Sequence, residues 1–468
     1  MSTRSLRLRK LAAGIGIAAL AALGSVGAAG AAQAADPASP SNITGTTGTL
    51  TIHKHAGDPG AAGNGTEITD PAAVQQLGQA LSGVQFSVQR VAYNGTAIDL
   101  TTAAGWDQAA TATPANITSA PFSFSSSTTA TTGANGEAVV ANLPYGLYYV
   151  TETNPGPNPI VSPVQPFLVS VPYPNQGTWL YDVHVYPKNK LNNTTPTKSV
   201  SAPDAPVLGS TVVWTVDAPL PALAAGDTYR SFSITDNLDA RLSYTGATVS
   251  VDGTTLVENT DYTVSGNVKI TFTSTGLSKL AGKTAVQAKI STKVTSLGAN
   301  GQITNTAVVN TNGSDRETNT PQTNWGPLVI QKTDAATSNA LSGAIFEVYD
   351  AKNGTLVTGP FTTDATGKIS IAGLWVGNDS VTSRTYWVKE TQAPAGYVLP
   401  ADPWTQVTVN ATGADTPTTV TIDNTQQQGP NLPLTGGAGS ALFTIVGGGL
   451  VVAGVGTIIA RRARAKRS

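Results

Sequence analysis

The chain carries lysines and acids at matching places in a repeated pattern, and it contains no cysteine. Lys54 and Lys332 each end a short run with strand-like alternation, and Glu152 and Glu390 lie in a later strand-like run. A lysine amine is a nucleophile only when neutral, and burial lowers a lysine pKa while raising that of a carboxyl group. Disulfide and thiol chemistry are excluded, so any covalent staple must use side chains such as these.

A second reactive pattern lies near the end of the sequence. Its motif consists of Leu432, Pro433, Leu434, Thr435 and Gly436. An apolar run of about 19 residues, 442–460, follows and is long enough to cross a bilayer as a helix. Five basic residues between 461 and 467 come next, and we expect them to stay on the cytoplasmic side.

This order resembles the cell-wall sorting signal of Gram-positive surface proteins, with its LPxTG motif. The resemblance implies that a sortase, a membrane transpeptidase, cuts between Thr435 and Gly436 and passes the threonine carbonyl to an amine. An ordinary C-terminal membrane anchor is the alternative. At the other end, basic residues before an apolar run from Leu11, and then Ala32-Gln33-Ala34, predict a signal peptide over residues 1–35.

The composition excludes several classes of function. Charged residues make up 12% and the net charge is −1, so no basic surface for nucleic acid is indicated. The three histidines are too few for a metal enzyme, and we expect His53 and His55 to share a solvated strand face. No cysteine nucleophile and no GxSxG motif are present. We therefore predict no catalytic turnover, no cofactor and no bound metal.

The remaining pattern predicts an all-β chain of tandem immunoglobulin-like sandwiches. Short alternating runs are separated by turn residues, and long helical periodicity is missing between the terminal signals. Segment 80–88 is matched almost residue for residue by 340–348, so two copies of one unit flank a different middle segment. The Ser/Thr/Ala-rich insertion 101–132 is predicted to form loops. The expected domains are 36–190, 191–326 and 327–427, with the sorting signal in 428–468.

Two further motifs carry a family resemblance. Residues 179–188 match the pilin motif WxxxVxVYPK, which ends at Lys188. Residues 386–397 match the E-box YxLxETxAPxGY, with Val388 in place of leucine. With the sorting signal, the chain resembles a major (shaft) pilin of sortase-assembled Gram-positive pili, SpaA/FimA-like, built as an elongated rod. The resemblance implies that Lys188 of one subunit attacks the acyl-enzyme formed on Thr435 of another.

The same resemblance implies internal Lys–Asn amide bonds helped by an acid. Domains of the Cna-B type suggest Lys332, Asn424 and Glu390 for the last domain. They suggest Lys54, Asn189 and Glu152 for the first domain. The Cna-A variant, which uses aspartate, suggests Lys198, Asp236 and Asn305 for the middle domain. The alternative at each site is a solvated strand lysine paired with an acid.

The function implied is a structural subunit of a covalent, wall-attached surface pilus. Its expected partners are other copies of itself, a pilin-specific and a housekeeping sortase, and peptidoglycan, with no nucleic acid. Tip and minor pilins and host surface ligands are further candidates. The competing hypothesis is a wall-anchored monomeric adhesin that binds host matrix or glycan. The complete pilin motif favours the polymer, because a monomeric adhesin does not need it.

Overall fold

The structure is a computed structural model, and it describes residues 39–429. The predicted signal peptide, sorting motif and membrane span lie outside these residues. Within 39–429, no helix is both long enough and apolar enough to cross a bilayer. Strands dominate the described chain, as the alternating sequence pattern predicts.

The first domain holds thirteen strands, two short helices and one 3₁₀ turn. The strands are β1 (Thr47–His53), β2 (His55–Ala56), β3 (Gln85–Tyr93), β4 (Thr96–Ala97), β5 (Phe122–Thr131), β6 (Glu137–Pro144), β7 (Gly146–Asn154), β8 (Ile160–Ser162), β9 (Phe167–Val171), β10 (Tyr173–Asn175), β11 (Thr178–Leu180), β12 (Asp182–Val185) and β13 (Lys188–Leu191). The helical segments are η1 (Pro40–Asn42), α1 (Pro71–Gln76) and α2 (Ala103–Thr111). The largest sheet of this domain has the order β4-β3-β7-β9, with β5 also paired to β3, and two three-stranded sheets have the orders β12-β1-β6 and β2-β13-β8.

The middle domain is a sandwich of two five-stranded sheets. Its elements are β14 (Thr197–Val200), β15 (Thr211–Pro219), β16 (Phe232–Asp236), β17 (Leu242–Val251), β18 (Thr254–Thr255), β19 (Tyr262–Ser265), β20 (Lys269–Phe272), α3 (Ser274–Ser278), β21 (Ala285–Val294), β22 (Gln302–Thr304), β23 (Ala307–Thr311) and β24 (Ser314–Glu317). The sheets run β14-β15-β21-β17-β18 and β19-β20-β16-β23-β24. Alternate residues of β15 and β21 are buried, which is the period-2 pattern of a strand with one face in a core.

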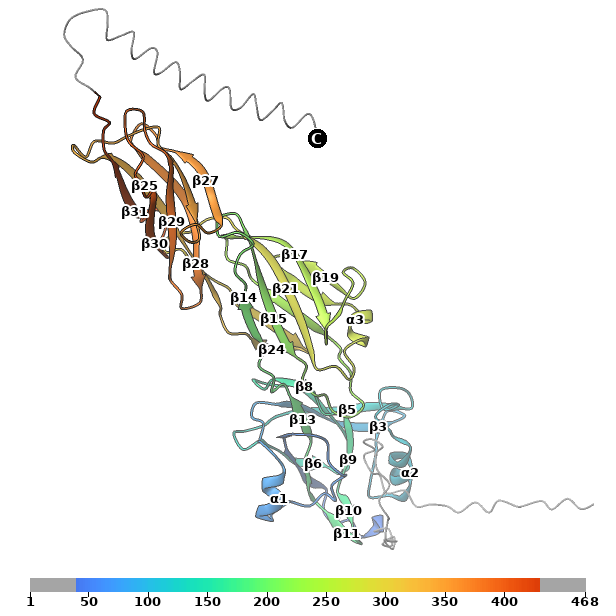
Figure 1. The fold of residues 1–468 in the computed structure, drawn as a ribbon. Helices are drawn as coiled ribbons and strands as arrows, with labels where there is room; N and C mark the ends of the chain where they lie inside the picture. The colour runs from blue at the N-terminus through green and yellow to red at the C-terminus, as the bar shows by residue number, and fades with distance from the viewer. Residues whose placement is uncertain (1–38, 430–468) are drawn as a thin grey trace, which may run out of the picture. The chain divides into compact units, whose positions relative to one another are not determined.

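The last domain pairs its first and last strands in parallel. Its strands are β25 (Gln322–Asp334), β26 (Ile345–Tyr349), β27 (Leu356–Thr362), β28 (Lys368–Asn378), β29 (Ser383–Gln392), β30 (Trp404–Asn410) and β31 (Thr418–Asn424). One sheet has the order β22-β25-β28 with β31 beside β25, and the other has the order β27-β26-β29-β30. Figure 1 shows β25 and β31 side by side within this domain.

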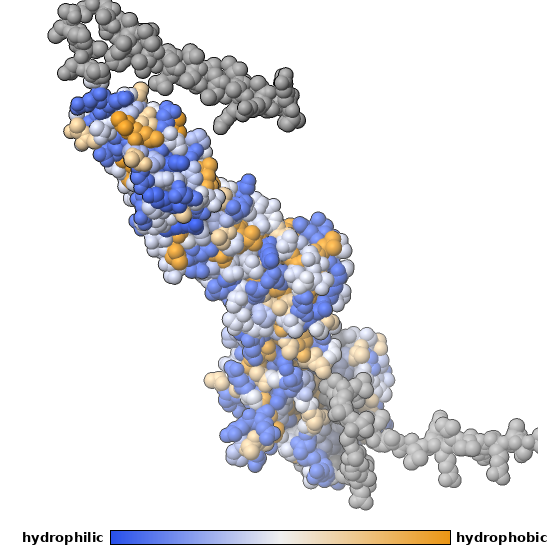
Figure 2. Space-filling model, viewed as in Figure 1, coloured by the Kyte–Doolittle hydropathy of each residue, from blue (hydrophilic) through white to orange (hydrophobic). Residues whose placement is uncertain are grey.

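Residue contacts divide the chain into two compact units. Within residues 39–429, one unit consists of 39–326, 373–384 and 410–416, and the other consists of 327–372, 385–409 and 417–429. The first and middle domains belong to the former, and each has its own apolar core. Polar and apolar residues are interspersed over the face that Figure 2 shows, as expected when alternate strand residues point outward.

The first and last domains repeat the same local structure around their first strands. Lys54 N and Lys332 N each donate to a turn glycine carbonyl at 2.7 Å, from Gly136 and Gly367. Both glycines have positive φ, and a Cβ there would lie 2.5 to 2.6 Å from the lysine carbonyl oxygen. Only glycine fits such a close backbone approach without displacement. The turn in each copy therefore fixes the backbone of the lysine beside it.

The prediction that 101–132 forms loops is wrong. The segment contains helix α2 and strand β5, and β5 pairs with β3 along nine positions from Tyr93 to Gln85. A separate apolar cluster that includes Leu100, Ala109 and Ile117 stabilises this region. β5 has few hydrophobic residues, and most of its serine and threonine side chains are exposed. The sequence therefore lacks the apolar alternation that would have predicted a strand.

Candidate covalent cross-linking sites

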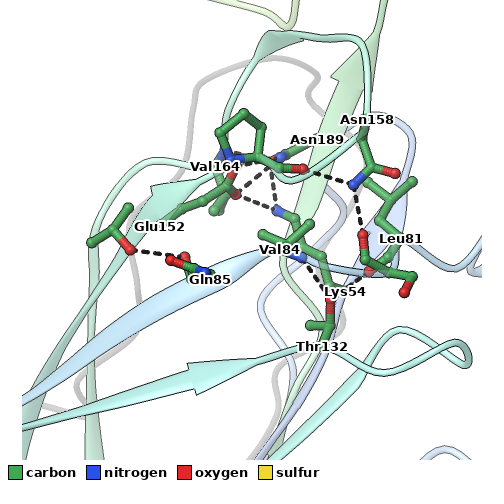
Figure 3. Close-up of polar contacts among 12 residues, drawn as sticks. Lys54, Leu81, Val84, Gln85, Thr132, Glu152, Asn158, Val164 and Asn189 are labelled. Carbon is green, nitrogen blue, oxygen red and sulfur yellow. Dashed lines mark hydrogen bonds and ion pairs between the residues drawn. The ribbon is translucent and has the colours of Figure 1, made fainter.

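The first domain brings Lys54, Glu152 and Asn189 into direct contact (Figure 3). Lys54 Nζ lies 2.5 Å from Asn189 Oδ1 and 3.0 Å from Glu152 Oε2. Asn189 Nδ2 donates to both oxygens of Glu152, at 2.8 and 2.9 Å. The Lys54 residue is 0% exposed and the Glu152 side chain 4%. The alternative of a solvated strand lysine does not describe this residue.

Strand register explains how these residues meet. His55 and Ala56 of β2 pair in parallel with Lys188 and Asn189 of β13, which brings Asn189 beside the chain just after Lys54. Glu152 comes from the other sheet, where it pairs with Phe86 next to a β-bulge. The backbone N–H of Val164 adds a hydrogen bond to Asn189 Oδ1 at 2.6 Å. The asparagine side chain is thus held on both of its polar atoms.

Burial sets the charge state of the first site. It lowers the pKa of Lys54 to about 8, while the carboxylate of Glu152 opposes the shift. A desolvated amine loses its proton more readily, because low-dielectric surroundings disfavour the ammonium form. With a pKa of about 8, about a tenth of Lys54 is neutral at pH 7, and this is the form that nucleophilic attack requires.

The middle domain builds a related site from Lys198, Asp236 and Asn305. Lys198 Nζ lies 2.8 Å from Asp236 Oδ2, and Asn305 Nδ2 donates to the same oxygen at 3.3 Å. Both charged side chains are 0% exposed. Burial lowers the pKa of Lys198 to about 8 and raises the pKa of Asp236. Lys198 comes from one sheet of the sandwich and Asp236 from the other, so a bond from Lys198 to Asn305 would tie the two layers.

The last domain also gathers its three predicted residues, with a different hydrogen-bond pattern. Asn424 Nδ2 donates to Glu390 Oε1 at 2.7 Å, whereas Lys332 Nζ donates to the carbonyl oxygen of Ile422 at 3.0 Å. All three residues are at most 2% exposed. Burial lowers the pKa of Lys332 and raises the pKa of Glu390. Asn424 Oδ1 and Glu390 Oε2 are buried and have no hydrogen-bond partner among residues 39–429, which marks an incompletely satisfied site.

Lys188 lies on β13 next to Asn189 but points to the other face of the strand. Its side chain is half-buried, and Nζ donates to the carbonyl oxygen of Gln76 at 3.4 Å. Lys190 shares that face, but its Nζ contacts both carboxylate oxygens of Asp58 at 2.6 and 2.7 Å. Among residues 39–429, Lys188 makes no ion pair. Its expected reaction partner, Thr435, lies outside this range.

Some residues around the sites escaped the sequence analysis. Thr132 Oγ1 accepts from Val84 N at 3.0 Å and donates to Leu81 O at 2.7 Å, and Thr363 makes the equivalent contacts in the last domain. Each threonine lies four residues before its turn glycine. Comparing the two copies position by position would have found the pair. Tyr397, the final E-box residue, donates from its hydroxyl to Asp334 at 2.9 Å, which no spacing rule predicts.

The expectation that His53 and His55 share a solvated face is wrong. β1 ends at His53, and His55 belongs to β2 with 8% exposure. His53 is half-buried, is hydrogen-bonded to His184 at 2.8 Å, and stacks on Tyr186 with ring centroids 4.6 Å apart. The break in the strand at Lys54 separates the two histidines, so alternation along one strand does not apply. Over residues 39–429, no cluster of three or more His, Cys, Asp or Glu side chains could hold a metal.

One surface groove among the described residues is polar and has a volume of about 330 Å³. It lies on the middle domain beside Asn305. Its lining consists of Thr235, Asn237, Asp239, Thr304, Asn305, Thr306, Val308 and Glu317. Sites for small molecules are mostly apolar with a few placed polar groups, and this groove has the opposite character.

Comparison with known protein families divides the chain in four. Residues 45–190 match the Gram-positive pilin subunit D1 N-terminal domain, and 193–324 match the Sgo0707 N2 domain. Residues 326–426 match a prealbumin-like fold domain, and 424–466 match the LPXTG cell wall anchor motif.

Similar proteins align along most of the sequence. Fimbrial subunit type 2 of Actinomyces naeslundii is 35% identical over 493 residues, covering 90% of each chain. Fimbrial subunit type 1 of Actinomyces viscosus is 30% identical over 490 residues, covering 88% of this chain and 89% of that one. The full-length major pilin SpaD from Corynebacterium diphtheriae has 28% identity and a TM-score of 0.58, covering 82% of this chain and 98% of its own.

These relatives are structural subunits rather than enzymes, and the anchor motif matches their location on the cell wall. The chain belongs to the family of Gram-positive fimbrial subunits, the major pilins of cell-wall-anchored surface pili.

Proposed function

We propose that this chain is the shaft subunit of a covalent pilus in which Thr435 of one copy is joined to Lys188 of the next. Sortase would cut the Thr435–Gly436 peptide bond and hold the threonine carbonyl as an acyl-enzyme. The neutral amine of Lys188 would then attack that carbonyl, release the enzyme and lose one proton. One acceptor and one donor per subunit give an open, linear polymer.

The observation that carries this proposal is the contrast between Lys188 and Lys190. The two share one face of β13, but Lys190 is held by Asp58, whereas Lys188 has only a long contact to a backbone carbonyl. An ion pair favours the ammonium form, which cannot attack. Lys188 is therefore the amine on this strand that is more easily released to an incoming acyl-enzyme.

The internal sites are proposed to form amide bonds that stabilise each domain. The lysine amine would attack the Cγ carbon of the asparagine, the Cγ–Nδ2 bond would break, and ammonia would leave with the proton lost by the amine. The buried acid can donate a proton to the amide and accept one from the amine. The proposed bonds are Lys54–Asn189, Lys198–Asn305 and Lys332–Asn424, assisted by Glu152, Asp236 and Glu390.

An immunoblot of wall extracts from the native cells tests the polymer. The wild-type chain should give a ladder of high-mass bands, and Lys188→Ala should leave a single band of secreted, folded subunit. Lys190→Ala is the matched control, because it removes a lysine from the same strand face and should keep the ladder. A full ladder in Lys188→Ala would overturn the assignment. A single band in the wild type would instead favour a monomeric adhesin.

Wall attachment is proposed to use the same Thr435, passed by a housekeeping sortase to peptidoglycan after a pilin-specific sortase has built the polymer. Deleting residues 432–436 should stop both polymerisation and covalent attachment. Release of the variant by detergent, without wall-digesting enzymes, would support this. Unchanged covalent attachment to peptidoglycan would contradict it.

A further inference from the structure

Asp334, two residues beyond Lys332 on β25, is 6% exposed and uses its two carboxylate oxygens differently. Oδ1 accepts hydrogen bonds from Ala336 N at 2.8 Å, Thr337 N at 2.7 Å and the Thr337 hydroxyl at 3.0 Å. Oδ2 accepts a hydrogen bond from the hydroxyl of Tyr397 at 2.9 Å. Oδ1 therefore stabilises the turn after β25, and Oδ2 accepts a hydrogen bond from a residue that is distant in the sequence.

Tyr397 belongs to a short segment, 396–398, that pairs with the end of the last strand. Val398 N donates to Thr425 O at 3.0 Å, and Gln427 N donates to Gly396 O at 2.8 Å. Tyr397 and Gln426 form the antiparallel bridge between these two bonds. The pairing begins at the residue directly after Asn424, the proposed acceptor of the last amide bond.

Asn424 also contacts the first strand from its other side. Its parallel partner on β25 is Asp334, and Ala335 N donates to Asn424 O at 3.0 Å. Asn424 is thus flanked by the pairing of 396–398 with residues 425–427 and by the pairing of β31 with β25. The Tyr397–Asp334 hydrogen bond connects these two pairings and closes a ring of contacts around Asn424. This ring holds the backbone of Asn424 two positions along β31 from Ile422, the residue that pairs with Lys332.

The first domain lacks this arrangement. The position corresponding to Asp334 is Ala56, and the position corresponding to Tyr397, seven residues after the acid, is Pro159. There the asparagine side chain itself is held, by Val164 N and by Lys54 Nζ. In the last domain, neither of those direct contacts to Asn424 Oδ1 is made, and this oxygen has no partner. In the last domain, Glu390 holds the Asn424 side chain at Nδ2, and the other contacts that hold this asparagine are made by its backbone.

We propose that Tyr397 and Asp334 are positioning residues for the last amide bond: their hydrogen bond holds the end of β31 so that Asn424 faces Lys332. The inference rests on the proposed internal bond of this domain. The contact persists over a wide pH range, since hydrogen bonds to Asp334 lower its pKa to about 2 and Asp334 raises the pKa of Tyr397. It gives a role to the tyrosine that lies seven residues beyond Glu390 in this chain.

The test is the rate of bond formation in newly synthesised full-length chain, followed by pulse labelling and mass mapping of the Lys332–Asn424 peptide. Tyr397→Phe and Asp334→Asn should each slow this bond about tenfold, as expected when a charge-assisted hydrogen bond that aids positioning is lost. The first and middle bonds in the same molecules should form at their normal rates. The pH profile of the slowed bond should keep its shape, because the reacting groups are unchanged.

Tyr349→Phe is the matched control. It removes a tyrosine hydroxyl that donates to a carboxylate, Glu347, at 2.6 Å in the same domain but on β26. It should leave the rate unchanged, which separates positioning from a general loss of stability. A normal rate in Tyr397→Phe, or equal slowing in Tyr349→Phe, would overturn the inference. If the wild-type chain forms its first and middle bonds but no last bond, the proposed function of this site fails, and the inference with it.

Discussion

The first and last domains are two versions of one cross-linking site, and they differ in what holds the asparagine. In both, the asparagine lies two positions beyond the residue opposite the lysine, and the acid pairs with a phenylalanine beside a β-bulge, Phe86 or Phe346. In the first domain, Lys54 Nζ already donates a hydrogen bond to Asn189 Oδ1. In the last domain, Lys332 Nζ donates a hydrogen bond to the carbonyl oxygen of Ile422, so the amine must turn toward Asn424 before it can react.

The difference shows that strand register decides which residues meet, whereas the local hydrogen bonds and ion pairs decide which partner the lysine amine has. Register brings the same three residue types together in both copies. The first copy places its amine well but keeps it in contact with Glu152, which favours the ammonium form. The last copy has no such direct ion pair, and burial moves the pKa values of Lys332 and Glu390 toward a neutral pair. Burial lowers the lysine pKa in both copies, so the copies differ in the partners of the amine: an asparagine oxygen and a carboxylate in the first, and a backbone carbonyl in the last.

The largest expected effect comes from removing the acid of either copy. Glu152→Ala and Glu390→Ala should each leave one ammonia unreleased, in their own domain only, by intact mass and peptide mapping. A cross-link that closes a loop of about 100 residues stabilises by roughly 4–5 kcal/mol, so the affected domain should melt roughly 20 °C lower by calorimetry of the ectodomain. Glu137→Ala and Glu347→Ala are the controls and should keep both bonds. Loss of both bonds in either single acid variant would show that the copies are not independent.

A smaller effect should distinguish the pH profiles of the two copies. With a Lys54 pKa of about 8, the neutral fraction of its amine rises about tenfold between pH 7 and pH 9, and the rate of the first bond should rise with it. Rising pH acts on the last bond in two opposite ways, because it increases the neutral fraction of Lys332 and decreases the protonated fraction of Glu390, so the profile of this bond should be less steep. Rates measured on freshly synthesised chain would check this. Equal profiles for both bonds would contradict the proposed difference in charge state.

The smallest effect concerns the histidines, all three of which lie in the first domain. Burial, followed by the neighbouring His184, lowers the pKa of His53, and burial lowers that of His55. The unfolded chain therefore binds more protons just below pH 6.5, so the first domain should lose stability as pH falls through that value. The amide protection factors, which correct for the intrinsic exchange rate at each pH, should fall a few-fold in β1 at pH 5.5 but not in β25. His53→Phe should keep the stack on Tyr186 and reduce this sensitivity; equal acid sensitivity of β25 would refute the histidine explanation.

The sequence predicted the contacts of the cross-linking sites better than their surroundings. The sets of lysine, acid and asparagine came from the resemblance to Cna-type domains, and the repeat supported only the matching lysines and acids of the first and last domains. The contact of Tyr397 with Asp334 could not be predicted, since it depends on how the chain returns after the motif. The histidine prediction failed because it assumed one continuous strand, and the structure breaks that strand at Lys54.

The most direct test of this account is the intact mass of the folded recombinant ectodomain, residues 36–431, with mapping of its branched peptides. The account predicts a mass lower than the sequence by three molecules of ammonia, with the branches at Lys54–Asn189, Lys198–Asn305 and Lys332–Asn424. The mass of the unmodified sequence, measured on fully folded protein, would contradict it and would leave these three lysines as buried side chains without a covalent bond.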